Sequence, residues 1–250
     1  MPGLINAHTH LFSQGKPLNP KLATPKGQRM VATFAHSPLG KPYMAATVKH
    51  NATTLLESGV TTIRTLGDVG YEVVTLRDQI DAGQILGPRI LASGPLMAIP
   101  EGHGAPLIAL TSGTPEEART AVAQNLKAGV NAIKIAATGI TDIQLENSKN
   151  VVGGMVSGAR QAHEAGLMIG VGTDTGMTFV PQYATWRELE LLVAYAGFSP
   201  AEALHAATAV NASILGVDAE TGSLEVGKSA DLLVLNANPL DDLRALEDRK

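Results

Sequence analysis

Two stretches of the sequence carry side chains that could hold a metal ion. His8 and His10 are separated by a single residue at the end of an apolar stretch, and Asp174 follows the apolar stretch 168–172. Residues two apart on a strand point to the same side, so the two imidazoles would project together. Imidazoles and carboxylates are common ligands of Zn²⁺. Two other interpretations stay open at this point: an exposed polar strand end for the histidines, and a helix-capping carboxylate for Asp174.

Lys134 is the next unusual residue, because it stands among apolar residues in the strand-like stretch Ala132–Ala136. A buried ammonium is costly unless it is paired, deprotonated or chemically modified. The alternative is that its alkyl chain packs on apolar surface while the ammonium reaches water. Lys134 is therefore a candidate site residue whose role the local sequence alone leaves open.

A repeated pattern of helices and strands must position these residues. Helical stretches end at Gly59, Gly129 and Gly166, where a helix C-cap favours positive φ. Two helices are predicted to begin with a capping box behind a proline, at Thr114–Glu117 and Ser199–Glu202. Strands are predicted at Leu4–His8, Thr61–Thr65, Arg89–Ala92, Ala132–Ala136 and Met168–Gly172. The boundaries of each unit thus follow from local residue chemistry.

Strands that alternate with helices predict an α/β fold with a parallel sheet, either an open doubly wound sheet or a (β/α)8 barrel. A nucleotide-binding open sheet would carry Gly-x-Gly-x-x-Gly after its first strand. Here the first strand is followed by His8-Thr9-His10, which disfavours that alternative.

The overall composition narrows the classes of function. The chain has 250 residues with Lys+Arg 19 and Asp+Glu 23, a net charge of −4, which argues against a nucleic-acid partner. It has no cysteine, which excludes disulfides and thiolate ligands. No apolar run approaches the roughly 20 residues that cross a bilayer, and the N-terminus does not resemble a secretory signal. The sequence therefore predicts a soluble, cytoplasmic globular protein without a membrane partner.

Taken together, these motifs resemble the amidohydrolase superfamily of metal-dependent hydrolases, in the subgroup with a carbamylated lysine and near its Xaa-Pro dipeptidase-like and imidazolonepropionase-like members. The stretches similar to the family's first, second, fourth and eighth strands are Pro2–His10, Gly59–Arg64, Ile133–Gly139 and Gly172–Asp174. The stretch Gly222–Leu232 is similar to the family's small β-sandwich. The resemblance covers most of the chain.

The resemblance implies a TIM-barrel hydrolase that cleaves an amide, peptide or cyclic amide bond in a small or dipeptide-like substrate. One or two divalent ions, often zinc, would be held by His8, His10, Asp174 and Lys134. Carbon dioxide would carbamylate Lys134, and Asp174 would be the general base toward a metal-activated water. His103 lies in a Gly-His-Gly loop similar to a substrate-binding loop of the family.

The sequence also departs from the family pattern. Only 28 residues, 140–167, separate the fourth and eighth strands, whereas one βα unit of a barrel takes about 30. We therefore expect an incomplete barrel domain at 1–218, with strands 5–7 and the histidines of strands 5 and 6 largely missing. We expect a β-sandwich remnant at 219–250, whose strand Asp231–Leu235 would lack a partner because the family's N-terminal segment is missing.

Two hypotheses of different classes follow from these departures. The first is a hydrolase that works with a reduced site of His8, His10, Lys134 and Asp174. The second is a catalytically inactive fragment that binds a metal ion or a partner chain. A homo-oligomer that completes the barrel is compatible with either hypothesis.

Overall fold

The computed structural model describes residues 1–17, 19–136 and 143–247. The final residues of the stretch Ile133–Gly139 lie outside these ranges. The strands are β1 Leu4–Thr9, β2 Val60–Thr65, β3 Arg89–Leu91, β4 Leu96–Ala98, β5 Ala109–Thr111 and β6 Ile135–Ala136. The helices are α1 Pro20–Ala23, α2 Pro25–Ala35, α3 Gly40–Glu57, α4 Glu72–Asp81, α5 Pro115–Lys127, α6 Ile143–Glu164, α7 Thr185–Ala196, α8 Pro200–His205 and α9 Asn211–Leu215, with a π-helix at Ala206–Val210 and a 3₁₀ helix at Leu243–Leu246.

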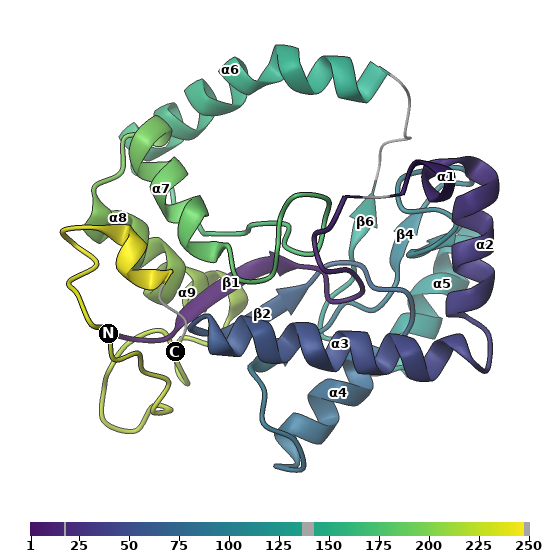
Figure 1. Cartoon of the computed structure of the whole chain (residues 1–250), viewed down its shortest axis with the longest axis horizontal. Helices are drawn as coiled ribbons and strands as arrows, with labels where there is room; N and C mark the ends of the chain where they lie inside the picture. The colour runs from purple at the N-terminus through teal and green to yellow at the C-terminus, as the bar shows by residue number, and fades with distance from the viewer. Residues whose placement is uncertain (18, 137–142, 248–250) are drawn as a thin grey trace.

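The described strands form two parallel sheets of three strands each, in the orders β1-β2-β3 and β5-β4-β6. A backbone hydrogen bond of 2.7 Å from Asn131 N to Ala92 O connects the two sheets, because Asn131 precedes β6 and Ala92 follows β3. Figure 1 shows β1 and β2 at the centre, α3 and α4 on one side of them, and α6 reaching across to α7. The parallel α/β arrangement predicted from the sequence is therefore confirmed.

The predicted helix boundaries are confirmed at the caps. Thr114 and Ser199 each form a complete capping box with the glutamate three residues later, and a proline follows each N-cap. The three glycines predicted to end helices all have positive φ, 88° at Gly59, 80° at Gly129 and 72° at Gly166. Local sequence chemistry fixes these helix ends because each cap satisfies backbone groups that the helix itself leaves unpaired.

The prediction of a strand at Met168–Gly172 is wrong. This stretch is extended beside β1, and Ala7 N donates to Val171 O at 3.0 Å, but no regular ladder forms. The reason is the buried side chain of Asn211, whose Oδ1 accepts from Val171 N and whose Nδ2 donates to Val171 O and Ile5 O. A side-chain amide therefore occupies the backbone groups that a neighbouring strand would otherwise pair.

The strand predicted at Ala132–Ala136 is shorter than expected: only its last two residues form β6. Lys134 contributes its carbonyl oxygen to the sheet, where it accepts from Met97 N at 2.8 Å. β4 and β5 were not predicted.

The C-terminal stretch Asp231–Leu235 also differs from the prediction. It is not a strand, and it does have a partner: Leu232 forms an antiparallel bridge with Pro2. Leu233 packs against the main core, whereas Val234 is 90% exposed. Backbone hydrogen bonds from Gly3 N to Asp231 O and from Leu233 N to Met1 O, at 2.8 Å and 2.9 Å, flank this bridge.

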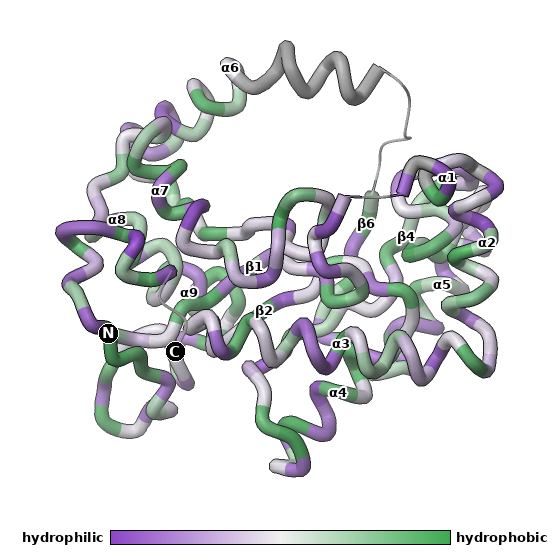
Figure 2. The backbone as a smooth tube through the Cα atoms, viewed as in Figure 1, coloured by the Kyte–Doolittle hydropathy of each residue, from purple (hydrophilic) through white to green (hydrophobic). Residues whose placement is uncertain are grey.

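Two hydrophobic clusters support the sheets. The larger one joins β1 and β2 to the helices α3, α4 and α7 and includes Leu4, Leu55, Ile63, Val73 and Leu189. The smaller one includes Met44, Val69, Leu96 and Ile108. Figure 2 shows hydrophobic residues along β1, β2 and β4. Each fully buried leucine or isoleucine contributes about 1.5–3 kcal/mol, so these clusters hold the strand ends in place. Among the described residues, no helix is long and apolar enough to cross a membrane.

Candidate metal centre

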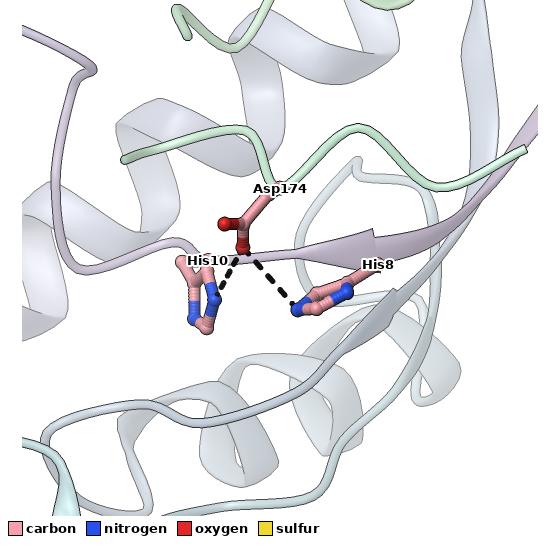
Figure 3. Close-up of side chains that lie close together, drawn as sticks. All are labelled: His8, His10 and Asp174. Carbon is pink, nitrogen blue, oxygen red and sulfur yellow. Dashed lines mark ion pairs between the residues drawn. The ribbon is translucent and has the colours of Figure 1, made fainter. Parts of the chain in front are cut away.

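Two imidazoles and one carboxylate converge at the end of β1. His8 Nε2 and His10 Nε2 lie 3.2 Å and 2.9 Å from the same oxygen, Asp174 Oδ1. Figure 3 shows both rings directed at this oxygen. His8 lies in β1, His10 directly follows β1, and Asp174 lies in a neighbouring loop. One ligand atom from each residue lies within 4.8 Å of the other two. The alternating geometry of a strand thus brings the predicted histidines together as expected.

A backbone carbonyl just after β2 fixes the position of a proton on His10. His10 is 5% exposed, and its Nδ1 donates to the carbonyl oxygen of Gly67 over 2.6 Å. Because a carbonyl oxygen only accepts, a proton must be on Nδ1, so in the neutral imidazole the lone pair is on Nε2, which faces Asp174. This arrangement is the usual one in a metal-ligating histidine, whose second ring nitrogen is held by a carbonyl or carboxylate.

Asp174 is held in a backbone conformation that is uncommon for a residue other than glycine. Its φ is 57°, in the left-handed region. Such a residue costs about 1–3 kcal/mol and persists only where its surroundings impose it. Two backbone hydrogen bonds impose this conformation here: Asp174 N donates to His8 O at 3.0 Å, and Met177 N donates to Asp174 O at 3.2 Å. The turn therefore aims the carboxylate at the two histidines at some cost in stability.

The electrostatics of the three residues differ. Burial lowers the pKa of His8 to about 4, with smaller contributions from the charges of His10, Lys134 and Arg64, against an opposing one from Asp174. Burial would also lower the pKa of His10, but the contact with Asp174, the charge of Asp68 and the Gly67 carbonyl outweigh it and raise that pKa.

Burial would raise the pKa of Asp174, but the contact with His10 and the charges of both histidines and of Lys134 outweigh it and lower that pKa. At neutral pH, His8 is therefore neutral and Asp174 is ionised.

These residues fit a divalent cation. Asp174 Oδ1 is buried and has no well-aligned hydrogen-bond donor, although two ring nitrogens lie close to it. Electron pairs of Asp174, His10 and the neutral His8 thus face one small volume, where a proton or a cation must lie between them. Two imidazoles and a carboxylate are a ligand set that suits zinc and related ions.

The remaining predicted site residues line the same cavity as the three ligand candidates. This cavity has a volume of about 370 Å³. Lys134 and His103 are both half-buried at its wall. His103 is not among the three residues whose ligand atoms lie within 4.8 Å of one another. The full lining is His8, His10, Leu66, Leu96, His103, Ile108, Lys134, Ile135, Ala136, Asp174 and Met177. A larger cavity of about 930 Å³ lies between α3 and α4 and is lined by none of the predicted site residues.

Sequence reasoning missed the polar residues behind the two histidines. The carboxylate of Asp68 is buried, accepts from Leu11 N at 3.2 Å, and has a pKa that burial raises to about 6. Sequence reasoning explains Asp68 as a turn carboxylate, but its place three residues after β2 is also a signal of a functional group, since such groups gather at the carboxyl ends of parallel strands. The buried amides Asn51 and Gln182 bond to the backbone near His10 and carry no such signal.

Comparison with known proteins gives one family. The sequence matches the Amidohydrolase family in two segments, residues 1–152 and 144–250. An imidazolonepropionase from Symbiobacterium thermophilum is 41% identical over 78 residues, 31% of this chain and 18% of that protein. An ochratoxinase from Aspergillus niger is 39% identical over 90 residues, 36% of this chain and 18% of that protein. The matched stretches therefore span under a fifth of the length of these curated relatives.

Solved structures cover more of the chain. A candidate prolidase from Bifidobacterium longum is 64% identical, with a TM-score of 0.82 over 99% of this chain and 77% of that one. A Xaa-Pro dipeptidase with bound methionine is 22% identical, with a TM-score of 0.76 over 99% and 83%. Ochratoxinase from A. niger is 20% identical, with a TM-score of 0.77 over 100% and 80%. The last two likenesses show the fold alone, which is the TIM barrel of amidohydrolases.

Proposed function

Because the chain belongs to the amidohydrolase family, we propose that it hydrolyses a carbon–nitrogen bond in a small amide, dipeptide or cyclic amide, in the cavity beside His8, His10 and Asp174. The observation that carries this proposal is the approach of two imidazole Nε2 atoms to one buried carboxylate oxygen. The relatives named prolidase, ochratoxinase and imidazolonepropionase support the bond class. The choice among their substrates is left to a screen.

The three ligand candidates would hold one divalent ion, for which we propose zinc. When bound, such an ion lowers the pKa of a water molecule and polarises a substrate carbonyl. His8, with a pKa near 4, offers a neutral imidazole, and the Gly67 carbonyl keeps the lone pair of His10 Nε2 available. The lowered pKa of Asp174 keeps its carboxylate ionised, so it can accept the proton of the attacking water and pass it to the leaving nitrogen.

Lys134 is proposed to react with carbon dioxide. Its ammonium would lose one proton, and the free amine would form a bond to the carbon and lose a second proton, which converts a cation into a carboxylate-like group. Its position at the cavity wall supports this, as does the effect of its charge on the pKa of both His8 and Asp174. A second ion would depend on this carbamate, because no further histidine, aspartate or glutamate of the described residues joins the cluster.

His103 is proposed to contact the substrate. It stands in the cavity wall outside the ligand cluster, so it can donate or accept a hydrogen bond without competing for the ion. The apolar residues Leu66, Leu96 and Met177 line the same cavity, which favours a substrate with a compact apolar group next to the scissile bond.

A second function, that of a metal-binding protein without turnover, is favoured by one specific observation. Between β6 and the stretch 168–172, the only regular element of the described residues is α6. We therefore propose that the barrel is incomplete at this side. If it is, the chain either works with a reduced site or is completed by a second copy. The division at 218/219 and the cytoplasmic location remain predictions.

The test is metal content followed by a substrate screen. Protein purified without chelators is analysed for metal per chain, and its molar mass is measured by light scattering. About one ion per chain and hydrolysis of Xaa-Pro dipeptides, N-acyl amino acids or cyclic amides are expected. Metal without hydrolysis of any substrate would favour the non-catalytic function, and absence of metal from a folded chain would contradict both proposals.

A further inference from the structure

The two loops that carry the ligands lie side by side. One is residues 10–15, which follow β1, and the other is residues 174–182, which lead to α7. His10 N donates to Thr175 O at 2.7 Å, and Phe179 N donates to Gly15 O at 2.8 Å. The distance between the His10 imidazole and the Asp174 carboxylate therefore depends on how these two loops are held together.

Gln182 joins the two loops through its side chain. It is 3% exposed, and its Nε2 donates to His10 O and to Ser13 O, both at 2.8 Å. Both of its N–H groups are therefore used on the loop that carries His10. Its Oε1 is buried without a hydrogen-bond partner. Leaving an amide oxygen unpaired is unfavourable, so the two hydrogen bonds that Gln182 donates must offset that cost.

Asn51 of a different element holds the same loop. This residue of α3 is 1% exposed, and its Nδ2 donates to Leu11 O at 2.8 Å and to Ser13 O at 2.9 Å. Three carbonyls of the loop, those of His10, Leu11 and Ser13, thus accept hydrogen bonds from two buried amides. Backbone carbonyls in an irregular segment need such partners, and here they come from two elements that are far apart in the sequence.

The packing between the loops leaves no room for a side chain at Gly15 or Gly176. A Cβ added to Gly176 would lie 2.2 Å from His10 O, and one added to Gly15 would lie 2.5 Å from Val180 O. The loops approach one another as closely as backbone atoms allow. Any shift of residues 10–15 would therefore be transmitted to Asp174, which lies two residues before Gly176.

We propose that Gln182 and Asn51 are positioning residues that set the metal affinity of the centre formed by His8, His10 and Asp174. Neither residue touches the ion or the substrate; each acts by fixing the loop after β1 against the loop that carries Asp174. The inference rests on the proposed metal centre. Replacing a residue that hydrogen-bonds to a metal ligand, without itself binding the ion, typically weakens metal affinity by about 10–100-fold.

A matched control distinguishes this role from a general contribution to folding. Asn125 of α5 is likewise a fully buried amide; it donates to Pro95 O at 3.1 Å and accepts from the Tyr71 hydroxyl at 2.8 Å. Its partners belong to neither ligand-bearing loop. Replacing it should therefore lower stability as much as replacing Asn51, without moving the metal ligands.

The experiment is a Co²⁺ titration followed by visible absorption, with the folded state of each variant checked by circular dichroism. Gln182→Met and Asn51→Leu are expected to raise the Kd for Co²⁺ by about 10–100-fold and to change the shape of the absorption band. Asn125→Leu is expected to melt at a lower temperature with an unchanged Kd and band. Should Gln182→Met fail to fold, Gln182→Asn keeps the amide on a side chain one methylene shorter and should also bind more weakly.

The outcomes separate this inference from the function on which it rests. A wild-type chain that binds no Co²⁺ would contradict the metal centre itself. Tight binding by the wild-type chain and equally tight binding by the Gln182 and Asn51 variants would overturn the positioning role alone. An equal loss of affinity in Asn125→Leu would also overturn it, because the effect would then be one of general destabilisation.

Discussion

The loops around the metal centre and the helix α6 are built in opposite ways. At the centre, a Cβ added to Gly176 would meet a backbone oxygen at 2.2 Å, whereas a Cβ added to Gly153, Gly154 or Gly158 of α6 would meet nothing within 4 Å. Met155 of α6 is 68% exposed. Close packing fixes atoms in place, while an unpacked helix face fixes nothing. The chain therefore holds its candidate ligands rigidly although a neighbouring region is loosely packed.

The C-terminal end of helix α6 is attached to α7 and to the residues just after it. Arg160 donates to Tyr195 O at 2.9 Å, and the ring of His163 stacks on Phe198 with a centroid distance of 4.0 Å. Both partners lie on or just after α7, the helix whose first residue, Thr185, accepts a hydrogen bond from Asn6 of β1. The helix α7 thus connects the tightly packed region to the loosely packed one.

The largest expected effect lies at the centre of the tightly packed region. Asp174→Asn removes the proposed proton acceptor while keeping the shape of the side chain, so turnover should fall by about 10²–10⁴-fold at saturating metal, and metal should bind more weakly. Asp241→Asn, a change at an exposed carboxylate, is the control. The measurement is kcat for the best substrate of the screen, and an unchanged kcat would exclude Asp174 as the base.

The next effect tests the close packing itself. Gly176→Ala places a methyl group against His10 O at a residue whose φ is 95°, so the free energy of unfolding should fall by about 3 kcal/mol. Metal binding should weaken with it, because the two loops must separate. Urea unfolding and Co²⁺ titration measure the two effects. A variant as stable as the wild-type chain would mean that the loops are less tightly packed than described.

A smaller effect of opposite sign is expected in α6. Gly154→Ala adds a methyl group in open space and removes a flexible residue from a helix interior, so the free energy of unfolding should rise by about 0.5–1 kcal/mol. Turnover and metal affinity should not change. A loss of stability would show that this face of α6 is covered in solution, for example by a second copy of the chain.

The smallest expected effect concerns the helix between the two regions and becomes visible only when pH is varied. Burial raises the pKa of Glu188 in α7. The folded state therefore holds this proton more tightly than the unfolded state, and ionisation of Glu188 lowers stability as pH rises through its folded pKa. Glu188→Gln should be more stable than the wild-type chain at pH 7–8.

The difference should vanish below about pH 4.5, where the glutamate is protonated in both states. Thermal melts across this range measure it. A stability difference that is independent of pH would contradict the assignment of the effect to ionisation.

Sequence reasoning found the ligand candidates because their placement follows from strand geometry. His8 and His10 are two residues apart, and Asp174 follows a segment that runs parallel to β1, so all three meet at one edge. The capping boxes at Thr114 and Ser199 were also predictable, since each is a purely local structure.

Other features depend on residues that are distant in the sequence and could not be predicted in this way. The strand expected at Met168–Gly172 is absent because Asn211, about 40 residues later, inserts its amide. Asn51 and Gln182 are ordinary amides in unremarkable stretches, and only the folded chain reveals that both meet the loop after β1. A single sequence contains no local pattern for such contacts.

The exposed glycines of α6 have a consequence for limited digestion. A protease that cleaves an accessible, weakly packed backbone would cut first near Gly153–Gly158. The cut would leave His8 and His10 on one fragment and Asp174 on the other. The two fragments would still be held together by backbone hydrogen bonds from Ala7 and His10 to the stretch 171–175. The proposed ligands thus lie on both sides of α6 in the sequence. A metal ion bound to all three would therefore link the two fragments after cleavage.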